Sequence, residues 1–171
     1  MATHTIGRQL AELLYDWKER RPRLSTAYLA DSSVPGWHNY GGTSVWSFKT
    51  VRDRSTDIGH DPRGLGRWSW MRFQGKQNVY TRVVSCYRPN TPNDKSDGGH
   101  SAWSQQQVSL DEQDIDTDPR QLFLDDITEA IRQWLAAGDH IVLGADLNED
   151  VSSPAIRTTL IRAGLCSHLK K

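Results

Sequence analysis

The segment IVLGADLNED, residues 141–150, decides the fold that we expect for this chain. Its three branched apolar residues predict a short buried strand, and Gly144 marks the end of that strand. Asp146 and Asn148 follow at alternate positions, and residues two apart in an extended chain point the same way. Both side chains would therefore project from the carboxyl end of a strand, a common place for sites in layered α/β sheets.

This pair of an acid and an amide suits phosphodiester cleavage, which depends mostly on positioning and on charge stabilisation. An ionised Asp146 can hold a divalent metal or orient a water molecule. The neutral amide of Asn148 can donate to a phosphate oxygen without adding negative charge. The alternative is an ordinary exposed turn after the strand, because Asp and Asn are common turn residues.

Length and composition predict one globular domain over residues 1–171. The chain contains no apolar run near the roughly 20 residues that a membrane span needs, and its start lacks a signal-peptide core. We therefore expect an intracellular protein, nuclear or cytoplasmic, that does not enter a membrane. Cys86 and Cys166 fit no metal or redox spacing, which favours two free thiols in a reducing compartment over a single bridge.

The formal net charge of zero conceals two segments of opposite charge. Residues 49–88 carry nine Lys or Arg and three acids, whereas residues 111–150 carry twelve acids and two basic residues. A metal-dependent phosphodiesterase could use this order, because cations gather a polyanion and carboxylates hold the metal. The alternative for most of these acids is a solvated loop and the exposed face of a helix.

Two further strands are predicted to end in polar residues. A strand over residues 78–87 stops at Pro89 and presents Tyr87, Arg88 and Asn90, each of which can donate to a phosphate oxygen. A strand over residues 24–30 is followed by a second carboxylate, Asp31, for which an ordinary turn is the alternative.

The remaining elements follow from hydrophobic periodicity and from capping residues. We expect helices over residues 5–20, from Asp118 to Gly138, and from Ser153 to Gly164. The other expected elements are strands over 43–48 and 67–73, a hairpin turn over 74–77, an irregular polar segment over 52–66, a helical turn over 102–108 and an acidic linker over 109–117.

Two tryptophans and six histidines are the other residues that could serve a site. Trp68 and Trp70 share one face of the predicted 67–73 strand, which favours a place in the core over a platform for stacking bases. No histidine has metal-ligand spacing to another, so the sequence predicts no histidine metal centre.

Several of these stretches together resemble the endonuclease/exonuclease/phosphatase superfamily. This is the DNase I-like fold of abasic-site endonucleases and of endonuclease domains in non-LTR retrotransposons. Residues 144–148, Gly-Ala-Asp-Leu-Asn, look like the family's Gly-Asp-Phe-Asn strand exit with one residue inserted or shifted at Ala145. Residues 83–90 are similar to the family's strand that ends in Tyr-x-Pro-Asn. Residues 29–32, Leu-Ala-Asp-Ser, are a weaker match to the family's Leu-Gln-Glu-Thr.

The resemblance implies a role for each matching position. Asp146 would orient or activate the attacking water, and Asn148 and Tyr87 would hold the scissile phosphate. Asp31 would replace the family's metal-binding glutamate, with a side chain one methylene shorter, and would bind Mg²⁺ or Mn²⁺. Three further residues would contact the substrate, namely Asn90, Arg88 and Arg67.

The chain departs from the family pattern at both ends. The family opens with a strand that carries an Asn, whereas this chain opens with the helix predicted over residues 5–20. The family closes with an Asp-bearing strand and a Ser-Asp-His sequence, and His168 lies in no such context. The resemblance covers about residues 24–165, so we expect an incomplete sandwich whose second sheet is largely missing. Such a chain would be a fragment of a longer reading frame or a decayed copy.

The expected fold is therefore α/β, a DNase I-like layered α–β sandwich. The resemblance implies a divalent-metal-dependent endonuclease that acts on nucleic acid, on DNA rather than RNA. The alternative from a different class is a non-catalytic remnant that binds nucleic acid or a protein. A third alternative is a phosphatase of the same superfamily that acts on inositol lipids or small phosphomonoesters, although no residue of the chain selects it.

Overall fold

The computed structural model describes residues 22–29, 41–91 and 101–165. Within them, a four-stranded sheet has the order β3-β4-β5-β6 and a two-stranded sheet pairs β1 with β2. Strands β5 and β6 run parallel, and the other neighbouring pairs run antiparallel. The elements in chain order are β1 (Arg23–Ala27), β2 (Thr43–Ser47), α2 (Lys49–Arg52), β3 (Ser55–His60), β4 (Trp68–Gln74), the 3₁₀ helix η1 (Lys76–Asn78), β5 (Tyr80–Tyr87), α3 (Ala102–Asp111), α4 (Pro119–Ala136), β6 (Asp139–Asp146) and α5 (Pro154–Arg162).

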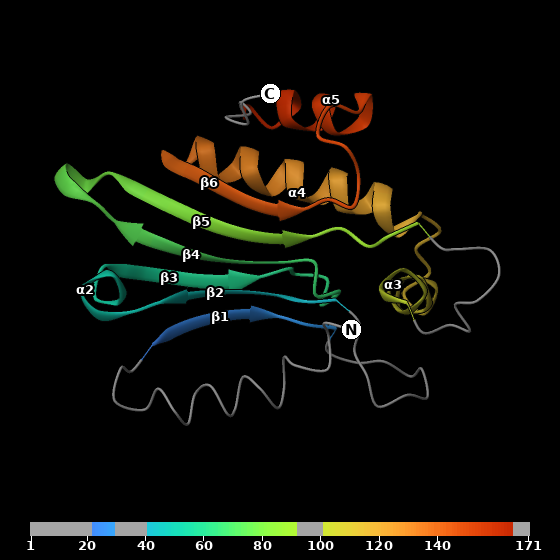
Figure 1. Ribbon diagram of the computed structural model, residues 1–171, viewed down its shortest axis with the longest axis horizontal. Coiled ribbons are helices and arrows are strands. Elements are labelled where there is room, and N and C mark those ends of the chain that lie inside the picture. Colours follow the sequence, from blue (N-terminus) through green and yellow to red (C-terminus); the bar gives the residue numbers. More distant parts are fainter. Residues whose placement is uncertain (1–21, 30–40, 92–100, 166–171) are drawn as a thin grey trace.

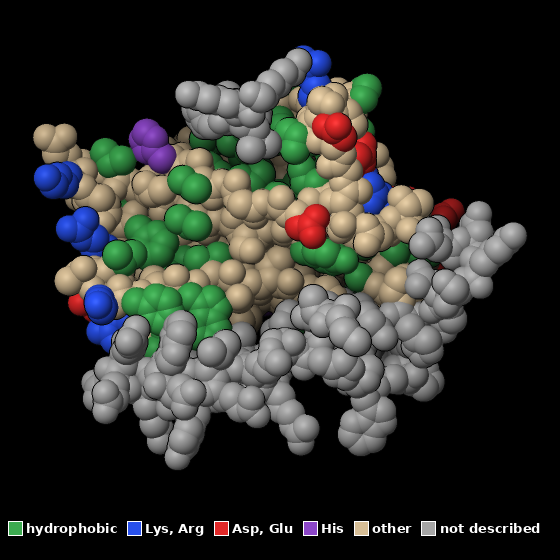
Figure 2. Space-filling view, in the orientation of Figure 1, with side chains coloured by type: hydrophobic (Ala, Val, Ile, Leu, Met, Phe, Trp, Pro, Cys, Tyr) green, Lys and Arg blue, Asp and Glu red, His purple; other side chains and the backbone are tan. Residues whose placement is uncertain are grey.

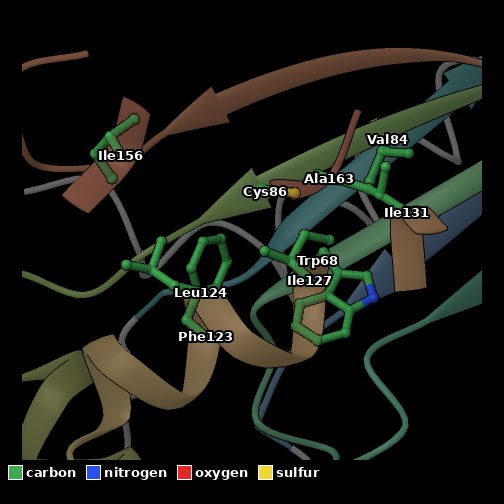
Figure 3. Close-up of a cluster of buried hydrophobic side chains, with 9 residues drawn as sticks. All are labelled: Trp68, Val84, Cys86, Phe123, Leu124, Ile127, Ile131, Ile156 and Ala163. Carbon is green, nitrogen blue, oxygen red and sulfur yellow. The ribbon is translucent and has the colours of Figure 1, made fainter. Parts of the chain in front are cut away.

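Helices α4 and α5 cover one face of the larger sheet (Figure 1). Alternate residues of β4 and β5 point to this face, so Trp68 and Val84 join the same buried cluster as Phe123 of α4 and Ile156 of α5 (Figure 3). The Trp68 and Phe123 rings meet edge to face, with their centroids 6.1 Å apart. The core interpretation of Trp68 is therefore correct.

The opposite face of the sheet is covered by the β1–β2 pair, which contacts β3, β4 and β5. This second layer is joined partly by hydroxyl groups. Ser25 Oγ donates to the Gly59 carbonyl at 2.7 Å, and Thr43 Oγ1 donates to Ser69 Oγ at 3.1 Å. Within the described residues the second sheet has two strands, and Val142 on the corresponding face of β6 remains 54% exposed. The layered α/β fold with a reduced second sheet agrees with the fold class expected from the sequence.

Both predicted helix starts in the described region are confirmed. The Asp118 carboxylate accepts hydrogen bonds from the backbone N–H groups of Arg120 and Gln121 at 2.8 and 3.0 Å, and α4 begins directly after it. Ser153 caps α5 in the same way through the Ile156 N–H. Local side-chain chemistry determines both boundaries, which explains why they could be found from sequence.

Three segments differ from the sequence prediction. Strand β6, expected to be buried and to end at Gly144, runs to Asp146 and exposes five of its eight residues. The stretch over residues 52–66, expected to be irregular, contains the end of α2 and all of β3. Strand β3 lies at the edge of its sheet and exposes most of its side chains, so it lacks the apolar alternation that marks a strand. The helical turn expected over residues 102–108 is a ten-residue helix, α3, capped by Ser101.

Some predictions fall on residues that the structure does not describe, among them the helix over residues 5–20, Asp31, Cys166 and His168. Cys86 is described and is a free, buried thiol. No helix within the described residues is both long enough and apolar enough to cross a membrane.

Candidate phosphate-binding site at the ends of β5 and β6

The parallel pairing of β5 and β6 brings two of the predicted polar strand ends together. Tyr87, the last residue of β5, is the register partner of Asp146, the last residue of β6. The backbone continues this pairing, because the Arg88 N–H donates to the Asp146 carbonyl at 2.9 Å. The carboxyl ends of two parallel strands thus form one edge, as the sequence analysis expected for Tyr87 and Asp146.

Asn148 is anchored to this edge through both its backbone and its side chain. Its backbone N–H donates to Asp146 Oδ1 at 3.2 Å, and its Nδ2 donates to the Arg88 carbonyl at 2.7 Å. The φ angle of Asn148 is +48°, a left-handed conformation that Asn adopts more readily than most residues. This sharp turn returns the chain toward β5 and places the Asn148 amide beside Tyr87.

Tyr87 is suited to donate a hydrogen bond. Burial is the main cause that raises the pKa of its phenol, the Asp146 charge raises this pKa further, and a hydrogen bond with Asn148 opposes the shift. The hydroxyl therefore stays protonated at neutral pH. Gly41 (φ +86°) packs closely on the ring, since a Cβ added to Gly41 would lie 3.1 Å from Tyr87 Cε1.

Asp146 is the accessible acid of the group. Its side chain is exposed, and within the described residues no Lys, Arg or His lies within ion-pair distance of it. An ionised carboxylate in this setting can accept a proton from, or orient, a water molecule that approaches the edge. Tyr87 and Asn148 supply neutral donors next to it.

The remaining predicted site residues lie in different surroundings. Asn90 is exposed, three residues beyond the end of β5. The Arg88 side chain is turned inward, where its Nη1 bonds to Glu149 and its Nε donates to the Arg120 carbonyl. Arg67 is fully buried, so its guanidinium is not open to a substrate in solvent. We therefore leave Arg67 out of the substrate contacts that we propose below.

Arg67 instead belongs to a buried cluster of ion pairs. Its guanidinium donates to both oxygens of Asp61 at 2.6 and 2.9 Å and to Asp126 Oδ2 at 2.8 Å. Arg63 bonds to the same Asp126 carboxylate from the surface side. Burial opposes ionisation of Asp126, but the hydrogen bonds from Arg63 and Arg67 outweigh it and leave the pKa of Asp126 lowered. These residues connect the loop after β3 to α4.

The two charged segments of the sequence largely neutralise each other inside the fold. Five of the nine basic residues in the segment 49–88 pair with acids of the segment 111–150. On the face that Figure 2 shows, Lys and Arg gather at the left end and most of the visible Asp and Glu lie to the right. The positive charge available to a polyanion is therefore smaller than the sequence suggested. The five pairs are Arg63–Asp126, Arg67–Asp126, Arg72–Asp139, Arg82–Asp139 and Arg88–Glu149.

The described residues do not by themselves form a site for Mg²⁺ or Mn²⁺. No group of three or more His, Cys, Asp or Glu in the described ranges could hold an ion. Asp31, the residue expected to bind the metal, lies outside these ranges. Mg²⁺ usually keeps several of its water ligands and is held through one or two carboxylates, and the described part of the edge offers only Asp146 as an acid without an ion pair. No step of the chemistry below is therefore assigned to a metal.

Two residues at the site were missed in the sequence analysis. Glu149 directly follows Asn148 and bonds to Arg88 and Arg120 across the end of β5. Gly41 packs on Tyr87 from the loop before β2. Both contacts join residues far apart in the chain, so no local pattern indicates them.

Comparison with solved structures identifies the fold to which this arrangement of strands and helices belongs. No protein-family model matches the sequence, and no curated protein does so either. Two solved structures of the beta toxin of Staphylococcus aureus, one of them a β-hairpin deletion mutant, superpose with TM-scores of 0.52 and 0.54 at 12% identity. A sphingomyelinase C from Streptomyces griseocarneus gives a TM-score of 0.47 at 13% identity.

The superposition covers 92% of this chain and 54–55% of the beta toxin chains. The chain therefore spans about half the length of the solved structures that it matches. The shared fold is DNase I-like, and at this identity the similarity shows the fold alone.

Proposed function

We propose that this protein is a phosphodiesterase-type hydrolase whose reacting phosphate binds at the ends of β5 and β6. The observation that carries the proposal is the register of the parallel pair, which sets Tyr87 beside Asp146 with the Asn148 amide folded back onto β5. The DNase I-like fold supports it, because this edge is where the family-like motifs of the sequence meet.

Each of the three side chains has a distinct task in this proposal. The exposed Asp146 carboxylate orients the attacking water and accepts its proton. The Tyr87 hydroxyl, which is held protonated by burial and by the nearby carboxylate, donates to a non-bridging phosphate oxygen. Asn148 donates one amide hydrogen to the Arg88 carbonyl and hydrogen-bonds to Tyr87, and a bound phosphate oxygen takes the place of Tyr87 as acceptor of the second amide hydrogen.

We propose a phosphodiester as the substrate class, and nucleic acid as the first member to test. The motif resemblance favours DNA, with Asn90 exposed near the edge to line a groove. The internal pairing of five basic residues argues for a modest electrostatic contribution from the protein surface.

The test is a cleavage assay with matched variants. Supercoiled DNA, abasic DNA, RNA, sphingomyelin and a nitrophenyl phosphodiester are each incubated with the protein, with Mg²⁺, with Mn²⁺ or with a chelator. We expect Asp146→Ala to reduce the rate about 10²- to 10⁴-fold, the range for loss of a general base. The control is Asp125→Asn on α4, which removes an acid that accepts hydrogen bonds from Gln121 on the same helix.

Activity that survives Asp146→Ala would remove Asp146 from the chemistry. Salt-sensitive binding of a phosphodiester without turnover would instead make the protein a binding module that uses the same edge.

A further inference from the structure

Glu149, Arg88 and Arg120 form an ion-pair cluster, here named the Glu149 clamp, next to the proposed site. Glu149 Oε2 accepts hydrogen bonds from Arg88 Nη1 and, at 3.0 Å, from Arg120 Nη2. The two arginines are also tied to backbone, because Arg88 Nε donates to the Arg120 carbonyl and Arg120 Nη1 donates to the Pro89 carbonyl. One carboxylate thereby links the end of β5, the start of α4 and the loop after β6.

The clamp is largely shielded from solvent. The side chains of Arg88 and Arg120 are 6% and 11% exposed, and that of Glu149 is 27% exposed. A hydrogen bond from Ser153, followed by the one from Arg88, lowers the pKa of Glu149, so the carboxylate is ionised at neutral pH. Charge-assisted hydrogen bonds in such a setting are stronger and more directional than exposed ion pairs.

Two members of the clamp are sequence neighbours of the proposed phosphate-binding residues, because Glu149 is next to Asn148 and Arg88 is next to Tyr87. Glu149 follows Asn148, and the Arg88 carbonyl is the acceptor for Asn148 Nδ2. Arg88 is therefore held at its guanidinium by Glu149 while its carbonyl holds Asn148. By contrast, the next acid, Asp150, is exposed and accepts hydrogen bonds from Ser152 within its own turn.

We propose that Glu149 is a positioning residue, which acts through Arg88 and Arg120 to hold Asp146 and Asn148 against Tyr87 in the geometry that hydrolysis needs. This inference rests on the proposed function. A shift of about 1 Å in a catalytic group can cost on the order of 100-fold in rate. Ion pairs that hold the ends of β5 and β6 together therefore have a direct effect on turnover.

The experiment compares Glu149→Gln with Asp125→Asn, which removes the same charge from α4 without touching the clamp. Glu149→Asp tests rescue, because it keeps the charge on a shorter side chain. Thermal unfolding first establishes that each variant is folded. The first readout is the NMR resonance of the Asn148 side-chain amide, assigned by its loss in Asn148→Asp. The second is kcat and KM on the phosphodiester that the wild-type protein cleaves.

We expect Glu149→Gln to shift the Asn148 amide toward the position of an unbonded amide and to lower kcat about 10- to 100-fold, with a smaller change in KM. Glu149→Asp should recover part of both effects, and Asp125→Asn should resemble the wild-type protein. If Glu149→Gln does not fold, Arg120→Lys takes its place, since Lys keeps the charge on a single nitrogen whereas Arg120 bonds to Glu149 and to the Pro89 carbonyl through two different nitrogens.

A folded Glu149→Gln variant with an unchanged Asn148 resonance and unchanged kcat would overturn the clamp. A second outcome is that Glu149→Gln shifts the Asn148 resonance but the wild-type protein cleaves no phosphodiester. This outcome would overturn the proposed function, and with it the catalytic purpose of the clamp. The two failures are therefore distinguishable.

Discussion

The two ends of the parallel β5–β6 pair carry the same residue type in opposite settings. Asp139 begins β6 and is 3% exposed, whereas Asp146 ends the same strand and is exposed. Asp139 accepts hydrogen bonds from Arg72 and Arg82, with ion-pair distances of 2.8 and 2.9 Å. Asp146 has no ion pair within the described part of the chain. One strand therefore carries an acid that is neutralised within the fold and an acid that is left available.

Aromatic rings complete the closed end of the pair. The Arg82 guanidinium lies 3.9 Å from the Trp70 ring centroid and 4.8 Å from that of Trp134. Arg72 lies 3.7 Å from the Tyr80 ring. These contacts shield the ion pairs from water and add cation–π attraction. The closed end stabilises the fold, and the open end leaves a carboxylate beside two neutral donors, the group that we propose binds a phosphate.

The largest expected effect that separates the two ends is on stability. Asp139→Ala leaves two buried or half-buried guanidinium groups without their partner, so we expect a loss of about 3–5 kcal/mol in the free energy of unfolding. Asp146→Ala should change it by less than about 0.5 kcal/mol, the usual range for an exposed site. Urea unfolding at neutral pH measures both variants. Equal losses would mean that the two acids are not used differently.

Asp139 at the closed end should contribute to the pH dependence of stability. Burial opposes ionisation of Asp139, but hydrogen bonds from Arg72 and Arg82 outweigh it, so the pKa of Asp139 is lower than its ordinary value of 3.8. A group with a lowered pKa stabilises the folded state above the unfolded pKa, and this stability is lost as pH falls through the folded pKa. We expect the free energy of unfolding to fall below about pH 4, by about 1.4 kcal/mol for each unit of pKa shift.

Asp139→Asn should make that acid-induced decline shallower. The comparison is the same titration of the wild-type protein. A wild-type slope in Asp139→Asn would contradict the assignment of the acid sensitivity to the closed end.

A smaller effect is expected from the glycine that packs on Tyr87 at the open end. Gly41→Ala and Gly64→Ala both place Ala at positive φ, +86° and +72°, which costs about 1–2 kcal/mol. A Cβ at position 41 also crowds the Tyr87 ring at 3.1 Å, whereas one at position 64 meets nothing within 4 Å. Gly41→Ala should therefore be the more destabilising of the two and should alone move the Tyr87 ring resonances in an NMR spectrum. Identical behaviour would mean that the ring is not confined by Gly41.

Much of the fold could be predicted because local chemistry determines it. The Asp118 and Ser153 caps set the starts of α4 and α5, and the apolar run after Gly138 predicted β6. Tyr87 and Asp146 were each predicted at the end of a strand, and the parallel pairing of β5 with β6 in the structure brings them to the same edge of the sheet. Strand β3 was not predicted, because an exposed edge strand lacks the alternation of apolar and polar residues that marks a half-buried strand.

Which charged residues form buried ion pairs could not be predicted from the sequence in the same way. Arg67 and Arg82 look in sequence like Arg52, which lies on the surface and pairs with its neighbour Asp53. Arg67 pairs with Asp61, six residues earlier, and with Asp126, 59 residues further along the chain. Arg82 pairs with Asp139, 57 residues further along. Only the packing of α4 and β6 on the sheet brings these groups together.

The amino-acid sequence by itself determined where the chain turns, caps and extends, and which polar residues stand at the ends of strands, because these features depend on neighbours a few positions apart. The tertiary structure alone decided which of those polar residues became internal ion pairs and which stayed open to solvent. The physical reason is that burial and charge pairing depend on distances in space. Two aspartates seven positions apart on β6 can therefore have the same local sequence signal and opposite roles.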